Sequence, residues 1–383
     1  MRERSGSAPN SFSHVPNIRG FSPCRPFSDL ANTFLGRHGR ADSKGGAEKP
    51  SGQGRGPTTR AMTQQAQTAS QVASEMLQHS LSHTLASRAQ TNVAGAQAAL
   101  PDIDAPDRKN PQCVPEYVLD IMEYWRKVEP LYRPSPRYMQ HEDSQGRKLQ
   151  GEINERMRAI LVDWLVEVHL KFKLMPETLF LTVNLIDRFL AKKSSTRKNL
   201  QLVGVAAMLI ASKYEEIWAP EVKDFVYISD RAYSRDQILQ MEKYMLNALK
   251  FKLTVPTTYH FLERYRKAGT FRSGGASAQA EKALAHPCQF LVELAMPDYA
   301  SLQFKGSLLA TAAVHCGLKM HGRDPWPEAL AKHSGYPLEE VQKCARHLAE
   351  LHRKAPKASL TAVHKKYSNP KFMEVAKESP ALI

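Results

Sequence analysis

The sequence has few cysteines, no long apolar run and no dense cluster of basic residues. Its 383 residues contain five cysteines, and none of them forms a CxxC pair. This excludes a disulfide scaffold and a zinc ribbon, and it favours a reducing compartment. No stretch reaches the ~18 consecutive apolar residues that a membrane-spanning helix needs, so we expect no membrane association. The cysteines are Cys24, Cys113, Cys288, Cys316 and Cys344.

The net charge of +15 first suggests a nucleic-acid partner. The charge is spread along the chain, with +5 in residues 1–110, +3 in residues 111–253 and +7 in residues 254–383. None of the three segments contains the run of Lys and Arg that is typical of a DNA-binding arm. We therefore interpret the charge as a solvated protein surface and expect no nucleic-acid partner.

Sequence patterns that indicate catalysis are also missing. There is no GxxxxGK[ST] phosphate loop, no HExxH and no GxSxG. His79 and His83 are four residues apart, and Cys344 and His347 three, but neither pair has further ligands nearby. The sequence therefore predicts a binding protein without catalytic residues, cofactor or metal.

The first 110 residues differ in composition from the rest of the chain. They contain no Trp or Tyr and only four Phe, and they are rich in Ser, Gly, Pro, Ala, Gln and Arg. Such a segment cannot bury enough apolar surface to offset its loss of conformational entropy. We expect a disordered regulatory arm over residues 1–110, in which Met62 is an alternative initiation site.

From Asn110-Pro111 onward, helical periodicity dominates and alternating strand patterns are absent. We expect an all-α fold of two tandem five-helix bundles. Residues 111–256 would hold an N-terminal helix and the first bundle, residues 257–355 the second bundle, and residues 356–383 a C-terminal tail. The expected helices are Glu116–Val128, Ile153–Phe172, Pro176–Leu190, Asn199–Glu216, Pro220–Ile228, Ser234–Leu249, Thr257–Lys267, Ala278–Met296, Lys305–Met320, Pro327–Lys332 and Pro337–Arg353.

Four segments resemble the cyclin box. They are MRAILVDWLVEVHLKF at 157–172, ETLFLTVNLIDRFL at 177–190, LQLVGVAAMLIASKYEE at 200–216 and EVKDFVYISDRAYSRDQILQMEKYMLNALKF at 221–251. NPQCVPEYVLDIMEYW at 110–125 and VHLKF at 168–172 are similar to mitotic B-type cyclins. LHRKAPKASLTAVHKKYS at 351–368 and Ala219-Pro220 look closest to plant and algal members of that group. The resemblance covers residues 110–370, and it implies two cyclin-box bundles.

This resemblance implies a regulatory subunit that binds and activates a cyclin-dependent kinase at the G2-to-M transition. By motif position, Lys213 and Glu242 look like the pair that grips the kinase. Ile210, Tyr214 and Phe251 would supply apolar contacts around them. The alternative for Lys213 and Glu242 is an ordinary surface ion pair, which contributes ~0–1 kcal/mol.

The resemblance also implies a docking groove for substrates or inhibitors that contain an Arg-x-Leu motif. Its apolar stripe would be Met157, Leu161 and Trp164, spaced i, i+4 and i+7, with Glu167 and Gln201 at the polar edge. The alternative is that the stripe belongs to the core. Arg158 and Asp187 look like the family's internal salt bridge. Arg158 and Asp163 are polar residues on an otherwise apolar helix, so each needs a partner.

Residues 1–110 contain no intact RxxL destruction motif and no Lys-Glu-Asn triplet. The nearest candidate is the degenerate CRPFSDLAN at 24–32, which leaves the ubiquitin-ligase machinery as a further candidate partner. We expect the protein in the nucleus and cytoplasm. An alternative function is a double-cyclin-box general transcription factor that binds DNA and polymerase. A transcriptional-kinase cyclin would share the fold, but the MRAIL and VHLKF residues disfavour it.

Overall fold

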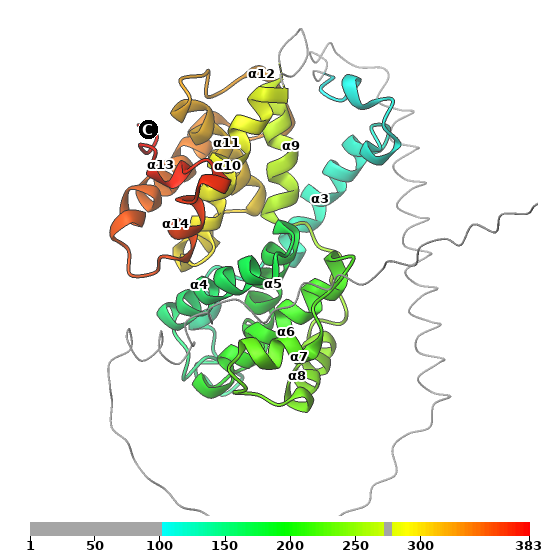
Figure 1. Ribbon diagram of the computed structural model, residues 1–383, viewed down its shortest axis with the longest axis vertical. Coiled ribbons are helices and arrows are strands. Elements are labelled where there is room, and N and C mark those ends of the chain that lie inside the picture. Colours follow the sequence, from blue (N-terminus) through cyan, green and yellow to red (C-terminus); the bar gives the residue numbers. More distant parts are fainter. Residues whose placement is uncertain (1–101, 272–277) are drawn as a thin grey trace, which may run out of the picture. The chain divides into compact units, whose positions relative to one another are not determined.

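The computed structural model describes residues 102–271 and 278–383, which form helices joined by loops (Figure 1). Within these two ranges the only strand-like pairing is an isolated bridge between Glu142 and Lys148. The predicted all-α class of two tandem bundles is confirmed. The expected arm and its degenerate destruction motif at 24–32 lie almost wholly outside the described residues.

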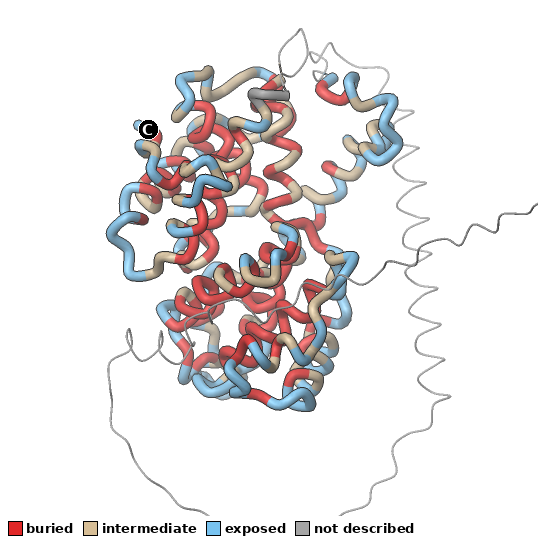
Figure 2. The backbone as a smooth tube through the Cα atoms, viewed as in Figure 1, coloured by how far each residue is buried: buried red, intermediate tan, exposed pale blue. Residues whose placement is uncertain are grey.

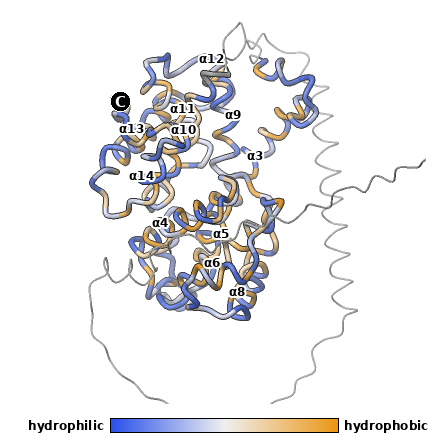
Figure 3. Tube along the Cα trace, viewed as in Figure 1, coloured by the Kyte–Doolittle hydropathy of each residue, from blue (hydrophilic) through white to orange (hydrophobic). Residues whose placement is uncertain are grey.

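The first bundle consists of five helices around α6. Leu200 through Ser212 of this helix are all buried, because apart from Gln201 they are apolar or small on every face and need neighbours all round. The expected start of α6 at Asn199 is wrong, because the helix begins at Arg197 after Thr196. Figure 3 shows that α4, α5 and α6 are largely apolar. The helices are α4 (Glu155–Phe172), α5 (Pro176–Leu190), α6 (Arg197–Glu215), α7 (Val222–Ile228) and α8 (Arg235–Ala248).

The second bundle repeats this plan around α11, of which Ser307 through Leu318 are buried. Buried residues follow the central helices of both bundles (Figure 2). Pro287 lies inside α10, which is one continuous helix. The helices are α9 (Thr258–Thr270), α10 (Ala278–Ala295), α11 (Gly306–Met320), α12 (Glu328–Ser334) and α13 (Leu338–Lys354).

A separate helix, α3 (Val118–Tyr132), precedes the first bundle, and it differs from the expectation at both ends. It continues four residues beyond the expected end at Val128 and includes Pro130. A proline costs one backbone hydrogen bond in the last turn. At this end of α3 the Glu129 carboxylate accepts hydrogen bonds from the Ser307 amide at 2.8 Å and its hydroxyl at 2.6 Å, at the start of α11. These bonds fix the end of α3 against the second bundle.

Ordered structure begins before the expected residue 110. Ile103 is fully buried against Ala268 and Ala329. The Asp104 carboxylate accepts hydrogen bonds at 2.6 Å from both Arg264 and Lys267 of α9. One apolar anchor and two ion pairs therefore hold the segment that leads into α3.

The C-terminal segment is packed through a short helix, α14 (Ala362–Tyr367), which contacts α10 and α4. Lys366 donates to both oxygens of Glu293 at 2.7 and 2.8 Å, and the Tyr367 hydroxyl donates to the same carboxylate at 2.8 Å. Lys366 and Glu293 are both buried. The expected tail at 356–383 is thus part of the folded structure.

Candidate functional site

Lys213 and Glu242, expected to bind a kinase, form an ion pair with each other. The Lys213 ammonium lies 2.6 Å from a Glu242 carboxylate oxygen. Lys213 is in the last turn of α6, and Glu242 is in α8, which packs beside it. The Lys213 side chain is 49% exposed and the Glu242 side chain 12%. Because the lysine end of the pair reaches solvent, the pair contributes about 0–1 kcal/mol, and exchanging its partners costs little.

Two aromatic side chains border this ion pair. The Tyr214 ring is exposed, while its hydroxyl lies 2.6 Å from the Thr254 hydroxyl, which fixes its direction. Phe251 is 64% exposed and follows α8 in a turn where Lys250 and Phe251 both have φ of +53°. This left-handed conformation is unfavourable for residues other than glycine, and such strain concentrates at functional sites. The turn holds a large apolar ring in solvent.

Ile210 does not lie on this surface, contrary to the expectation. It is buried within the first bundle, because α6 passes through the centre of the bundle and Ile210 is on an inward face. Sequence reasoning missed Ile217 and Trp218, which are 92% and 88% exposed in the loop after α6. Their signal was a pair of large apolar residues in a polar loop next to Pro220. The end of α6 and the segments that follow α6 and α8 carry four exposed apolar side chains, Tyr214, Ile217, Trp218 and Phe251, which we take together as one exposed apolar surface.

The expected docking stripe is buried. Met157, Leu161 and Trp164 all have 5% or less of their surface exposed, and Gln201 is buried too. Leu161 packs so closely on α6 that a Cβ atom on Gly204 would lie 2.7 Å from its methyl carbon. This close contact explains why residue 204 is a glycine, and it shows that Leu161 belongs to the core. Glu167 is half-buried.

Arg158 and Asp187 form the expected salt bridge between α4 and α5. The Arg158 guanidinium donates two hydrogen bonds to Asp187, at 2.6 and 2.7 Å, and both side chains are buried. Arg158 also donates to the Met296 carbonyl at 2.8 Å, and the Tyr138 hydroxyl donates to Asp187 at 2.9 Å. The pair therefore joins the first bundle to the end of α10 and to the segment after α3.

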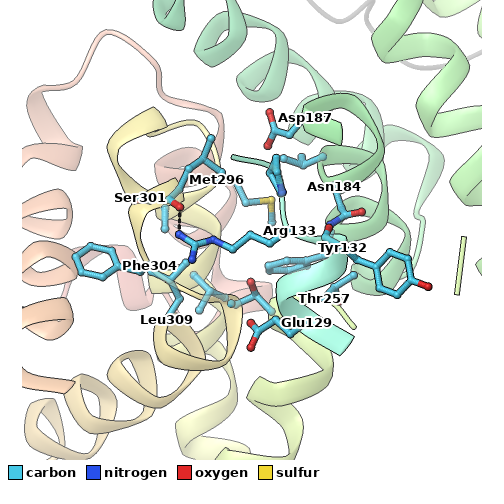
Figure 4. Close-up of a pocket in the computed structure, with 18 of the residues that line it drawn as sticks. Glu129, Tyr132, Arg133, Asn184, Asp187, Thr257, Met296, Ser301, Phe304 and Leu309 are labelled. Atoms are coloured by element: carbon cyan, nitrogen blue, oxygen red, sulfur yellow. Dashed lines mark hydrogen bonds between the residues drawn. The ribbon is translucent and has the colours of Figure 1, made fainter. Parts of the chain in front are cut away.

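A cavity of about 120 Å³ lies beside this salt bridge, where α3, α5 and the second bundle meet (Figure 4). Arg133 extends across it and donates to the Leu302 carbonyl. Burial is the largest influence on the Arg133 guanidinium and lowers its pKa. Phe304, Leu309 and Met296 supply apolar walls. The hydroxyl of Ser301, another lining residue, lies 2.8 Å from His347 Nε2 and donates to the Asp298 carboxylate at 2.7 Å. We assign no chemistry to the cavity.

The described residues show neither a metal site nor a membrane helix. In residues 102–271 and 278–383, no group of three or more His, Cys, Asp or Glu side chains could hold a metal ion. None of the described helices combines the length and apolarity needed to cross a bilayer. Cys113, Cys288, Cys316 and Cys344 are free thiols.

Two family models match this chain. "Cyclin, N-terminal domain" matches residues 120–254, and "Cyclin, C-terminal domain" matches residues 256–381. Together they cover both bundles, α14 and most of α3.

Named plant proteins are similar over most of the chain. A G2/mitotic-specific cyclin-1 of Medicago sativa subsp. varia is 49% identical over 281 residues, covering 73% of this chain and 62% of the relative. Cyclin-B2-1 of Oryza sativa subsp. japonica is 45% identical, covering 76% and 66%. A G2/mitotic-specific cyclin-2 of Medicago sativa is 47% identical, covering 73% and 80%. The chain thus spans less than two thirds of the length of the first two relatives.

A solved structure also shares the fold. A viral cyclin from herpesvirus saimiri superposes with a TM-score of 0.54, covering 64% of this chain and 99% of the viral one. Its sequence identity is 20%, so the similarity concerns the fold alone.

Proposed function

The chain belongs to the cyclin family, in its B-type, G2/mitotic group, and on that premise we propose that it binds and activates a cyclin-dependent kinase at the G2-to-M transition. The chain supplies no catalytic group to this reaction. It binds the active conformation of the kinase more tightly than the inactive one. This difference in affinity shifts the kinase population toward the active conformation. When a helix of the kinase N-lobe moves inward, the glutamate on that helix reaches the kinase lysine that contacts ATP.

The observation that supports this proposal most strongly is the Lys213–Glu242 pair within its exposed apolar surface. An ammonium donates to the carbonyls at a helix end, and a carboxylate accepts from backbone amides. Opposite charges on α6 and α8 can therefore hold one helix of a partner between them. Tyr214, Ile217, Trp218 and Phe251 would bury their exposed area in the same contact. Exposed apolar groups of this kind mark protein interfaces.

A pull-down with a purified cyclin-dependent kinase tests the partner. We expect the full chain to retain the kinase, and a Trp218→Ala/Phe251→Ala variant to retain much less. Both side chains are solvent-exposed, so the variant should keep its melting temperature. A matched control replaces Tyr117 and Leu131, exposed apolar residues in or next to α3, with alanine. Equal retention by wild type and the Trp218/Phe251 variant would contradict the proposed surface.

We also propose that α4 and α6 dock Arg-x-Leu segments of substrates or inhibitors. Glu167 and Gln201 would receive the arginine, and Met157 and Trp164 would contact the leucine. Since these two side chains are buried in the free chain, docking requires them to become accessible. A labelled Arg-x-Leu peptide should bind the full chain, and its Ala-x-Ala twin should not. Equal binding of both peptides would contradict the docking role.

We propose further that the protein acts in the nucleus and cytoplasm and that the ubiquitin-ligase machinery removes it after mitosis. A fluorescent fusion followed through a synchronised cell cycle tests both statements. A constant level through mitosis would contradict the second statement, and a signal restricted to one compartment would contradict the first. The named relatives are cyclins, which supports this function over the DNA-binding alternative.

A further inference from the structure

Five basic side chains gather where α5 ends and α8 turns. Arg188 is in the last turn of α5, and Lys192 and Lys193 follow this helix. Lys250 and Lys252 flank Phe251 in the strained turn after α8. The four lysines are exposed and the arginine is buried. We call these five residues the α5–α8 basic cluster.

No carboxylate in the described part of the chain neutralises this cluster, since none of its five members forms an ion pair there. Burial lowers the pKa of the Lys192 ammonium, and the positive charges of Arg188, Lys250 and Lys252 lower it further. Burial also lowers the pKa of Arg188 to about 10. The cations are close enough to repel one another, and an anion between them would relieve this repulsion.

The cluster is held in place by contacts that leave its lysines accessible. Arg188 donates to the Lys252 carbonyl at 2.9 Å and to the Asn184 side chain at 3.0 Å. The guanidinium carbon of Arg188 and the Lys252 ammonium lie 5.5 and 5.8 Å from the centre of the Tyr132 ring. Cation–π contacts at this distance fix both groups against one ring. The site is therefore organised before any ligand arrives.

We propose that the α5–α8 basic cluster binds a phosphoserine- or phosphothreonine-containing segment of a partner protein. A phosphate is close to a dianion at neutral pH and has three acceptor oxygens, so it satisfies several ammonium groups at once. A single carboxylate offers one charge to the same lysines. Lys250 and Lys252 flank Phe251 of the proposed kinase-binding surface, so the cluster borders that surface without including Lys213 or Glu242.

Nucleic acid fits the cluster less well. Single strands bind where aromatic rings are free to stack on bases, and duplexes need a longer basic stripe. Here cations already contact Tyr132 and, with Lys193 at 5.9 Å, Tyr244. The surrounding residues 111–253 have a net charge of only +3.

Fluorescence anisotropy with the full chain tests the inference. The probe is a labelled octapeptide of glycine and alanine with two phosphoserines, measured beside twins that carry serine or aspartate. The test variant is Lys250→Gln/Lys252→Gln, and glutamine tolerates the turn about as well as lysine does. The control is Lys343→Gln/Arg346→Gln, which removes two exposed cations from α13. Circular dichroism checks that both variants fold.

We expect the phosphopeptide to bind at least about fivefold more tightly than either twin, because several charge-assisted hydrogen bonds form. The test variant should lose at least about fivefold in affinity and the control less than about twofold, because surface charges far from the peptide are screened. Equal losses in both variants would show a general charge effect and overturn the proposal. Equal binding of the aspartate twin, or tighter binding of a 12-base-pair duplex with the same sensitivity to the variants, would also overturn it.

Discussion

At the scale of single residues, two buried polar side chains on α4 show how far the sequence could be interpreted. Arg158 and Asp163 stand among apolar residues, so both were predicted to need partners. The family pattern named Asp187 for Arg158, and the structure contains that pair. For Asp163 the sequence offered no partner, because the donor is the backbone amide of Ala362, 199 residues away. Residue type shows that a buried side chain needs hydrogen bonds, but no pattern in the sequence identifies a distant backbone donor.

Arg158→Ala should destabilise the fold before it affects any partner. It leaves the Asp187 carboxylate buried with the Tyr138 hydroxyl as its remaining side-chain donor, and it removes the hydrogen bond to the Met296 carbonyl. Breaking one partner of a buried pair costs about 3–5 kcal/mol. Thermal unfolding should show a melting temperature lower by roughly 6–15 °C for a domain of this size. An unchanged melting temperature would contradict the assignment of Arg158 and Asp187 as a stabilising salt bridge.

Asp163→Asn should stabilise the protein at neutral pH. Burial raises the pKa of the Asp163 carboxyl to about 6, even though the Ala362 amide donates to it at 2.9 Å. The folded chain therefore holds this proton more tightly than the unfolded chain, and stability falls as pH rises from about 4 to about 6. Asparagine keeps the acceptor oxygen without the buried charge. We expect a gain on the order of 2 kcal/mol at pH 7.5.

The pH dependence separates this effect from a general change in packing. The advantage of Asp163→Asn should shrink as pH falls below 6 and vanish below about pH 4, where the wild-type carboxyl is protonated in both the folded and the unfolded state. Chemical denaturation at pH 4.5, 6 and 7.5 measures it. A destabilised variant at pH 7.5, or an advantage independent of pH, would contradict the account.

At the scale of helices, apolar periodicity predicted the five helices of each bundle, and caps such as Ser234 set several boundaries. The errors have physical causes. Pro130 lies in a last turn that Glu129 fixes to α11, and α6 begins two residues before Asn199 with no side-chain cap. The resemblance gave Ile210 as a kinase contact, but this side chain is buried. Periodicity cannot tell which apolar residues stay exposed, so Trp218 was overlooked. Tertiary packing decides both.

Removal of α14 should destabilise the second bundle. A chain ended at residue 360 loses Lys366 and Tyr367, which donate to the Glu293 carboxylate of α10, and the buried side chains of α14. Removing one partner of a buried pair costs about 3–5 kcal/mol, so we expect a large fall in melting temperature. Adding Glu293→Gln to the shortened chain should recover part of the lost melting temperature, because burying a neutral amide costs less free energy than burying a carboxylate. No recovery would show that the buried charge is not the cause.

At the scale of the whole molecule, the distribution of charge changes how the net charge is interpreted. The net charge of +15 first suggested nucleic acid, yet residues 111–253, which include the proposed kinase-binding surface, have only +3. Within that part of the chain, one exposed ion pair lies beside four exposed apolar side chains, and five cations lie apart from any carboxylate. Composition reports the total charge, whereas the fold decides which charges meet. The central claim is that the Lys213–Glu242 surface activates a kinase.

The most direct test is the kinase activity of a purified cyclin-dependent kinase on histone as increasing amounts of the full chain are added. Wild type should raise the activity to saturation. A Lys213→Ala/Glu242→Ala variant should need at least about tenfold more protein, because two charge-assisted contacts to the kinase are lost. Its melting temperature should hardly change, since the exposed pair contributes about 0–1 kcal/mol. Activation by the variant at wild-type concentrations, or no activation by wild type, would contradict the account.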